Sequence, residues 1–167
     1  MSVSGYCSSK ILLHSKIFKR KAHIYLLAYS LLKKDYSMHL KIITHEKVVF
    51  DENVDEIYTR GVDGEFGILK NHVPIMSALD IGVTHIKQGE NTKCFTTMGG
   101  VLQFKDDECI ILTTTAECGD DIDVTRAKEA LRRAKERLED KDAAIDAKRA
   151  EAAVARAMAR LKATLNN

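Results

Sequence analysis

The sequence predicts an α+β fold in which an N-terminal all-β sandwich is followed by a C-terminal antiparallel two-helix hairpin. Between residues 38 and 119, short runs of β-branched and apolar residues are separated by turn signals at close spacing. From residue 120 onward, apolar residues recur every three or four positions, as they do on one side of a helix. We therefore predict three parts: a basic extension (1–37), a β-sandwich domain (38–119) and a helical hairpin domain (120–167).

The N-terminal extension differs from the rest in charge. Residues 1–37 carry seven lysines and arginines but a single acid, Asp35, whereas the rest of the chain is net negative. The longest apolar run, 24–32, is too short to span the roughly 30 Å hydrocarbon core of a bilayer. Three interpretations stay open: an organelle transit segment, a disordered basic tail, and a mis-assigned start. We favour the last, with translation beginning at Met38, because the folded pattern begins there.

Seven strands are expected in the sandwich, each a short run with β propensity and several of them alternating apolar and polar residues. The runs are 39–44, 47–50, 54–60, 81–86, 93–98, 101–104 and 108–114. Residues 88–91, Gly99-Gly100 and 105–107 are turn-forming in composition and are each expected to close a hairpin.

Two amphipathic helices are expected after the sandwich, separated by a polar break at residues 139–142. The first apolar stripe is Val124, Ala127, Leu131, Ala134 and Leu138, and the second is Ala143, Ala147, Ala150, Val154, Met158, Leu161 and Leu165. Both stripes are rich in alanine, which buries little area. Because burial of apolar surface contributes roughly 25 cal/mol per Å², the hairpin should dock weakly. A weakly docked hairpin is able to move.

The four cysteines do not form a recognisable site. Cys7, Cys94, Cys109 and Cys118 lack C-x-x-C spacing and have no histidine at ligand distance in sequence. We expect free thiols, buried or half-buried, with neither a disulfide framework nor a zinc site.

Arginines fall into rows on the two expected helices. Arg126, Arg133 and Arg137 share one side of the first helix, and Arg149, Arg156 and Arg160 repeat that spacing on the second. From the spacing alone, these rows are consistent with a solvated face that has local support, such as a pair between Glu129 and Arg133.

Three motifs occur in order along the chain. The first, Gly64–Pro74, combines a glycine-rich turn, an apolar pair and His-x-Pro; the others are Met98-Gly99-Gly100-Val101-Leu102 and Ile122-Asp123-Val124-Thr125-Arg126-Ala127. Gly64 and Gly67 are expected to allow positive φ and chain reversal, and His72 to be a hydrogen-bonded structural residue. With these motifs in register over residues 38–167, the chain resembles the epsilon subunit family of rotary F-type, proton-translocating ATP synthases.

The resemblance implies a non-catalytic rotor subunit of the central stalk. It implies that the sandwich binds the gamma subunit and rests on the c-subunit ring. The hairpin would either fold against the sandwich or extend toward the alpha/beta catalytic head and restrain ATP hydrolysis. The location implied is peripheral, on the cytoplasmic side of the inner cell membrane, although the extension leaves an organellar setting open.

The resemblance also implies a regulatory ligand. Some bacterial members bind ATP at the folded hairpin, and ATP would be a regulator and not a required cofactor. The matching positions are Glu117, Ile122, Asp123, Arg126, Ala127, Arg133, Arg156 and Arg160. Arginine suits phosphate because its planar fork donates two hydrogen bonds at fixed geometry.

Other classes of function are less well supported. The sequence holds no P-loop and no catalytic Ser/His/Asp or Cys/His arrangement, so we expect neither catalytic residues nor a metal site. Nucleic-acid binding is not expected because the folded part is net negative. The alternative is a stand-alone ligand-binding sandwich with a helical dimerisation arm, although the helical seams break after about two heptads. Copurification separates these two functions: a rotor subunit should copurify with gamma, whereas a stand-alone module should self-associate.

Overall fold

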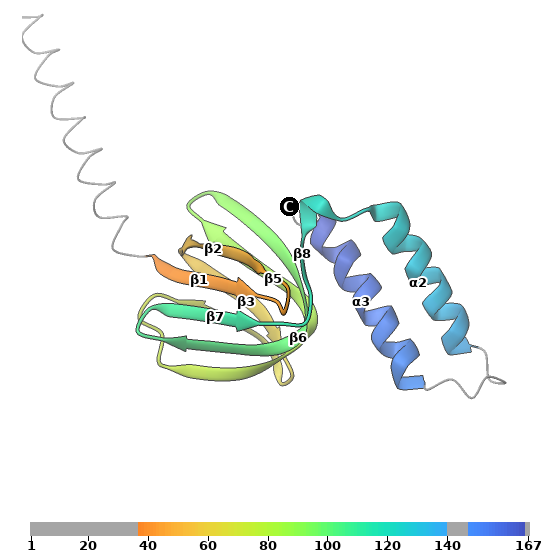
Figure 1. Cartoon of the computed structure of the whole chain (residues 1–167), viewed down its shortest axis with the longest axis horizontal. Helices are drawn as coiled ribbons and strands as arrows, with labels where there is room; N and C mark the ends of the chain where they lie inside the picture. The colour runs from red at the N-terminus through yellow and green to blue at the C-terminus, as the bar shows by residue number, and fades with distance from the viewer. Residues whose placement is uncertain (1–36, 140–146, 166–167) are drawn as a thin grey trace, which may run out of the picture. The chain divides into compact units, whose positions relative to one another are not determined.

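The computed structural model describes residues 37–139 and 147–165 (Figure 1). The predictions for residues 1–36, with the three interpretations of the extension, lie outside the described residues, as do Cys7, Ala143 and most of the expected break between the helices. No helix in the described ranges is long and apolar enough to cross a membrane.

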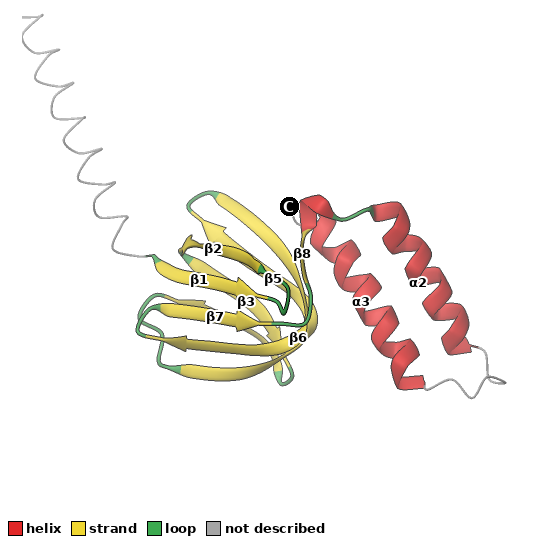
Figure 2. Ribbon diagram, in the orientation of Figure 1, coloured by secondary structure: helices red, strands yellow, loops and turns green. Residues whose placement is uncertain are grey.

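Eight strands form the β domain (Figure 2). They are β1 (Met38–Ile43), β2 (Val48–Val54), β3 (Glu56–Gly61), β4 (Gly64–Leu69), β5 (Ile75–Gln88), β6 (Asn91–Lys105), β7 (Glu108–Leu112) and β8 (Ala116–Cys118). The sheet order is β2-β1-β7-β6-β5-β3-β4, and β8 pairs with β6. Only β1 and β7 pair in parallel among these strands. The predicted fold class, a β-sandwich followed by two packed helices, is confirmed.

The sandwich core follows from alternation along the strands. In β1 the buried residues Met38, Leu40 and Ile42 alternate with half-exposed residues, as a strand with one face on the core requires. Ile57 of β3 and Phe104 of β6 join the same buried cluster. These side chains come from strands far apart in sequence, so the core depends on the whole sandwich being assembled.

Two of the three expected hairpin turns are confirmed. The β5–β6 turn uses Gly89 at φ 64°, and the β6–β7 turn uses Asp106 and Asp107 at φ 53° and 59°. Two successive residues with positive φ form the kind of tight hairpin turn that matches strand twist.

The expected hairpin at Gly99-Gly100 is wrong. Both glycines lie inside β6, which runs unbroken from Asn91 to Lys105 and keeps a constant register with β5. The two glycines, at φ 76° and 129°, lie instead between the part of β6 that pairs with β8 and the part that pairs with β7. At Gly100 the Leu112 carbonyl oxygen lies 2.0 Å from the position that a Cβ would occupy, so no side chain fits there.

The predictions for the glycines after β3 and for the expected strand 54–60 are only partly confirmed. Gly64, at φ 135°, does serve the reversal between β3 and β4. Gly67 does not reverse the chain: it lies within β4, a strand that the sequence pattern did not reveal, and faces the Tyr58 ring 2.8 Å from a would-be Cβ. The expected strand 54–60 is divided at Asp55, whose carboxylate accepts the Gly89 N–H at 2.6 Å.

His72 has a structural environment, as expected. Its Nδ1 lies 2.8 Å from the Val73 carbonyl oxygen, and its ring meets Phe104 edge-to-face with centroids 6.0 Å apart. The aromatic contact therefore joins the segment between β4 and β5 to β6, whereas the hydrogen bond lies within the segment.

A 3-10 turn, η2 (Gly119–Asp121), leads into the helices α2 (Val124–Glu139) and α3 (Ala147–Leu165). The buried residues of both helices are all alanines: Ala127, Ala134, Ala150, Ala157, Ala159 and Ala163. The expected α3 stripe is partly wrong, because Met158 and Leu165 are 56% and 82% exposed. The helix contacts two neighbours, α2 and the sandwich, so its buried surface is not a single stripe.

Helix α3 docks on the sandwich through small residues. Ala163 is fully buried in a cluster with Val83 of β5 and Cys94 of β6, and Ile122 packs against that cluster. Cys94 and Cys109 are buried and Cys118 is half-buried, as predicted for these three, and none of them is in a disulfide. Burial raises the pKa of the Cys109 thiol to about 12, so it stays protonated.

Candidate functional site

The third motif begins helix α2. The Asp123 carboxylate accepts the backbone N–H of Arg126 at 3.0 Å, and its carbonyl accepts the N–H of Ala127 at 2.9 Å. These are the bonds of an N-cap residue, which satisfies N–H groups that have no partner within the helix. Asp123 therefore has a structural role that sets the direction in which α2 leaves the sandwich.

Glu117 and Arg160 join the sandwich to α3. Arg160 Nε and Nη2 donate to the two Glu117 carboxylate oxygens at 2.8 and 2.7 Å. The Arg160 hydrogen bonds hold the pKa of Glu117 below its ordinary value against the opposing effect of burial, and the Arg126 charge acts in the same direction. The two side chains are 33% and 29% exposed, so the pair is a partly desolvated, bidentate contact.

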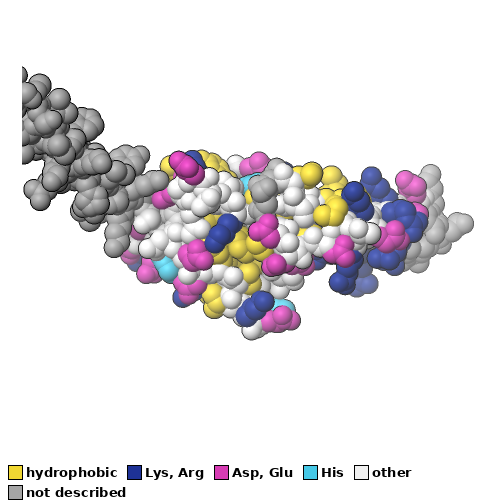
Figure 3. Space-filling view, turned by 90° about the horizontal axis from the view of Figure 1, so that it is seen from above, with side chains coloured by type: hydrophobic (Ala, Val, Ile, Leu, Met, Phe, Trp, Pro, Cys, Tyr) yellow, Lys and Arg dark blue, Asp and Glu magenta, His cyan; other side chains and the backbone are white. Residues whose placement is uncertain are grey.

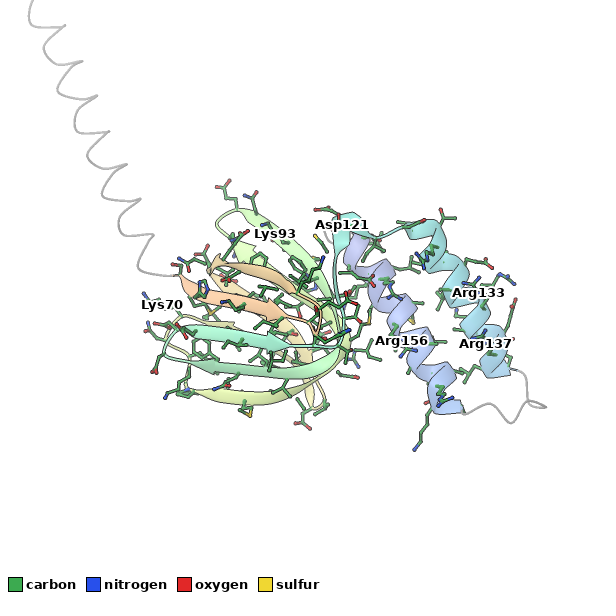
Figure 4. The ribbon with its side chains drawn as sticks, viewed as in Figure 1. Lys70, Lys93, Asp121, Arg133, Arg137 and Arg156 are labelled. Atoms are coloured by element: carbon green, nitrogen blue, oxygen red, sulfur yellow. The ribbon has the colours of Figure 1, made fainter. Side chains whose placement is uncertain are left out.

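A cavity of about 840 Å³ lies between the sandwich and the hairpin. Seven of the eight site residues expected from the sequence line it: Glu117, Ile122, Asp123, Arg126, Ala127, Arg133 and Arg160. The eighth, Arg156, does not line this cavity. It lines a second groove between α2 and α3, which Arg133 and Arg160 also border (Figure 4).

Strand residues that the sequence pattern did not reveal also line this cavity. Lys47 and Phe50 reach it from the β1–β2 hairpin, and Lys93 reaches it from β6. The Lys93 ammonium lies 5.2 Å from the Phe50 ring centroid and 3.3 Å from Glu52 Oε2. No local pattern marks these residues, because only the folded sheet brings them beside residues 117–133.

The cavity lining is suited to binding a charged or polar ligand. Its lining carries basic groups (Lys47, Lys93, Arg126, Arg133, Arg160) together with acidic ones (Glu52, Glu117, Asp120, Asp121, Asp123). Such a lining offers donors for an anionic group and acceptors for a polar one. Across the described parts of the chain, no three His, Cys, Asp or Glu side chains gather as a metal site would require.

Family models match both domains. The model for the ATP synthase Delta/Epsilon chain β-sandwich domain matches residues 37–119, and the model for the long α-helix domain of the same chain matches residues 120–164. The two matches together span most of the chain.

Bacterial proteins resemble about three quarters of the chain along nearly their whole length. It is 42% identical to the ATP synthase epsilon chain of Desulforamulus reducens over 127 residues, which cover 76% of this chain and 96% of that one. It is 46% identical to the ATP synthase epsilon chain of Symbiobacterium thermophilum, with 75% and 91% covered.

Solved structures share the fold at lower identity. A chain in the Euglena gracilis mitochondrial ATP synthase matches with a TM-score of 0.68 at 23% identity, covering 78% of this chain and 82% of that one. A chain in the central stalk/c-ring structure of the Tetrahymena thermophila enzyme matches with a TM-score of 0.53 at 18% identity, with 76% and 96% covered. With two domain models in order and bacterial identities above 40%, the chain belongs to the ATP synthase Delta/Epsilon family, as a non-catalytic epsilon chain.

Proposed function

We propose that the chain is a central-stalk rotor subunit that couples proton flow to ATP synthesis and restrains ATP hydrolysis through its hairpin. Membership of the epsilon chains supports this role. The small apolar contact of α3 with the sandwich supports the second half: Ala163 packs with Val83 and Cys94, and one half-buried ion pair joins Arg160 to Glu117. Two arrangements of such a hairpin can differ by only a few kcal/mol.

The partners proposed for the sandwich are the gamma subunit and the c-subunit ring. Several large apolar side chains of the sandwich face solvent, among them Val62 (62% exposed), Val73 (70%) and Met76 (68%). Where such side chains gather into one patch, they mark an interaction surface. In the extended state the hairpin would meet the alpha/beta catalytic head. The chain would be held peripherally, on the cytoplasmic side of the inner cell membrane, by these partners.

ATP is proposed as a regulatory ligand of the compact state. The observation that carries this proposal is the 840 Å³ cavity, where arginines from both helices meet residues of β8 and η2. A ligand bound there would touch the sandwich and the hairpin at once, and would therefore favour the arrangement in which both walls are present. Arg126, Arg133 and Arg160 would bind phosphate, with Arg156 reaching from the neighbouring groove.

The rotor assignment is tested by copurification. The tagged full chain is expected to retain a coexpressed gamma subunit from the same source through washes at moderate salt. A chain that instead elutes alone as a homodimer would favour the stand-alone sandwich with a dimerisation arm. No specific observation favours that alternative.

The ligand assignment is tested by isothermal titration of the full chain with Mg-ATP. Binding is expected for the native chain and for Arg132→Ala, whose side chain pairs with Glu129 on the outside of α2. An Arg126→Ala, Arg160→Ala double variant should lose it. Absence of heat from the native chain up to millimolar ATP would refute the ligand proposal and leave the rotor role in place.

A further inference from the structure

A histidine lies at the edge of the surface on which α3 docks. His85 of β5 is paired directly with Cys94 of β6, and Val83 lies two residues earlier on the same face of the sheet. Val83 and Cys94 pack against Ala163 of α3. His85 itself is half-buried, so its ring borders both the docked helix and solvent.

The contact with Cys94 favours a neutral imidazole ring. His85 Nδ1 lies 3.2 Å from Cys94 Sγ. Burial raises the pKa of the Cys94 thiol, so the thiol keeps its proton and donates it to Nδ1. A protonated imidazole carries an N–H at both nitrogens and cannot accept this hydrogen bond. Protonation of His85 therefore removes the bond that Cys94 donates.

The helix that docks beside this ring is strongly basic. Between Ala147 and Leu165, α3 carries five lysines and arginines but a single acid, Glu151. Basic side chains gather visibly over the hairpin in the space-filling view (Figure 3). Burial and, after it, the charge of Lys162 lower the pKa of His85, so a proton on the ring is disfavoured while α3 is docked.

The other titratable groups around the ring do not reverse this balance. Tyr58 of β3 pairs with the histidine across the sheet, and its hydroxyl donates to Glu56 Oε2 at 3.0 Å. Lys87, two residues further along β5, pairs with the same carboxylate at 3.2 Å. Glu65 of β4 favours the protonated ring, but its carboxylate lies 3.6 Å from the Lys162 ammonium. Both carboxylates therefore already have a cation beside them.

Undocking of α3 would change the affinity of His85 for a proton. In the docked state solvent reaches the ring through a cavity of about 280 Å³, which Tyr58, Glu65 and Phe66 also line. When α3 leaves, Lys162 leaves with it and the covered face of the sheet returns to water. The two effects that lower the pKa of His85 are then lost together. The docked and undocked hairpins therefore bind this proton with different affinities.

We propose that His85 is a pH sensor of hairpin docking: the neutral ring favours α3 docked on β5 and β6, and the protonated ring favours α3 undocked. Because the docked state has the lower pKa, docking is strongest above the ordinary histidine value of 6.5 and weakens as the pH falls below it. Acid would then increase the share of undocked hairpins, the arrangement proposed above to restrain ATP hydrolysis. That consequence rests on the proposed function, whereas the linkage between docking and the proton does not.

The first test is an NMR titration of the full chain, in which the carbon-bound ring protons report the pKa of His85. The native chain is compared with Ala163→Trp, whose neutral side chain is too large for the buried cluster and forces α3 away. His85 should bind its proton several times more tightly in Ala163→Trp, and that ratio is the factor by which acid favours undocking. His39 of β1, which pairs with Asp51, lies outside the docking cluster and should titrate equally in both chains.

The second test follows docking itself in Glu117→Gln, where the hairpin is already loosened and the Glu117 carboxylate no longer titrates. The methyl signals of Val83, which packs against Ala163, report the docked fraction. The ratio of undocked to docked chains should rise as the pH falls through 6.5, by at most about tenfold per pH unit, the limit for one proton. Adding His85→Gln should abolish this rise, whereas adding His39→Gln should leave it unchanged.

Equal proton affinity of His85 in the native and Ala163→Trp chains would overturn the proposal. So would a docked fraction that does not respond to pH, or a response that persists after His85→Gln. Should Ala163→Trp fail to fold, as circular dichroism would show, the Glu117→Gln series decides alone. Neither test uses gamma or a nucleotide, so failure here would leave the rotor role and the ATP proposal as they stand.

Discussion

At the scale of single residues, the contact that matters most is the bidentate pair between Glu117 and Arg160. It spans from β8 to α3, so it acts only when the hairpin is docked. Both side chains keep about a third of their surface in water, which places the contribution of the pair at about 1–2 kcal/mol, below that of a fully buried one. That amount adds to a small apolar contact in which Ala163 packs with Val83 and Cys94.

Glu117→Gln should loosen α3 without unfolding the sandwich. Glutamine keeps the shape but removes the charge, so undocking should become roughly five- to tenfold more frequent, for about 1 kcal/mol lost. The measurement is the labelling rate of Cys94, which α3 covers, against that of Cys109, which the sandwich core covers. Faster labelling of Cys94 alone is expected. Equal acceleration of both thiols would mean that the substitution destabilises the whole domain.

Acid should weaken the same contact. The pKa of Glu117 is lowered in the folded state from its ordinary 4.5, chiefly by Arg160, so its contribution is fully present above pH 4.5 and is lost as pH falls further. The difference in urea stability between the native chain and Glu117→Gln should therefore be constant from pH 7 to about 5 and should shrink below 4.5. A difference that stays the same at pH 3 would mean that the carboxylate charge is not what stabilises the docked state.

At the scale of elements, the glycines of β6 and of the β3–β4 turn provide a matched comparison. Gly100 and Gly64 have similar φ values, 129° and 135°, but a Cβ would collide with the Leu112 carbonyl only at Gly100. Gly64→Ala should cost about 1–2 kcal/mol from backbone strain, and Gly100→Ala clearly more, because strain and collision add. Urea unfolding of both variants measures this. Equal losses would contradict the close approach of β7 to β6.

The same elements show what a sequence can and cannot predict. The turns at residues 88–91 and 105–107 were predictable because their chemistry is local. The role of Gly99-Gly100 was not, because positive φ serves a hairpin and a mid-strand bend equally well, and only the change of partner from β7 to β8 decides. Likewise, Met158 fits the helical period but is exposed, because α3 contacts two neighbours instead of one.

The candidate site was predictable in part for a similar reason. Residues 122–133 follow one another closely along the chain, and their resemblance to a family motif was enough to group them into one site. Lys47 and Lys93 were not predicted to be in the site because they come from the β1–β2 hairpin and from β6, and only the assembled sheet brings them to the cavity. Arg137 stood in the arginine row, but its place in a groove depended on how the two helices pack.

At the scale of the whole molecule, few described side-chain contacts hold the hairpin against the sandwich, and a ligand bound between them would add more. Ala163 packs in a small cluster with β5 and β6, Arg160 pairs with Glu117, and Lys162 adds only a loose pair with Glu65 at 3.6 Å. A ligand in the cavity beside Arg160 would add contacts on both sides. We therefore expect a subunit whose two arrangements lie close in free energy and whose balance is set by anions.

The most direct measurement is ATP hydrolysis by the assembled ATP synthase with the hairpin fixed in its docked position. Ala163 shares a buried cluster with Cys94, so a disulfide formed in an Ala163→Cys variant would tie α3 to β6, and its formation is checked by mass spectrometry. Oxidised complexes should hydrolyse ATP faster than the same complexes after reduction, whereas oxidised Ala163→Ser complexes should not change. Equal rates before and after reduction of a disulfide that has demonstrably formed would contradict the claim that undocking of the hairpin restrains hydrolysis.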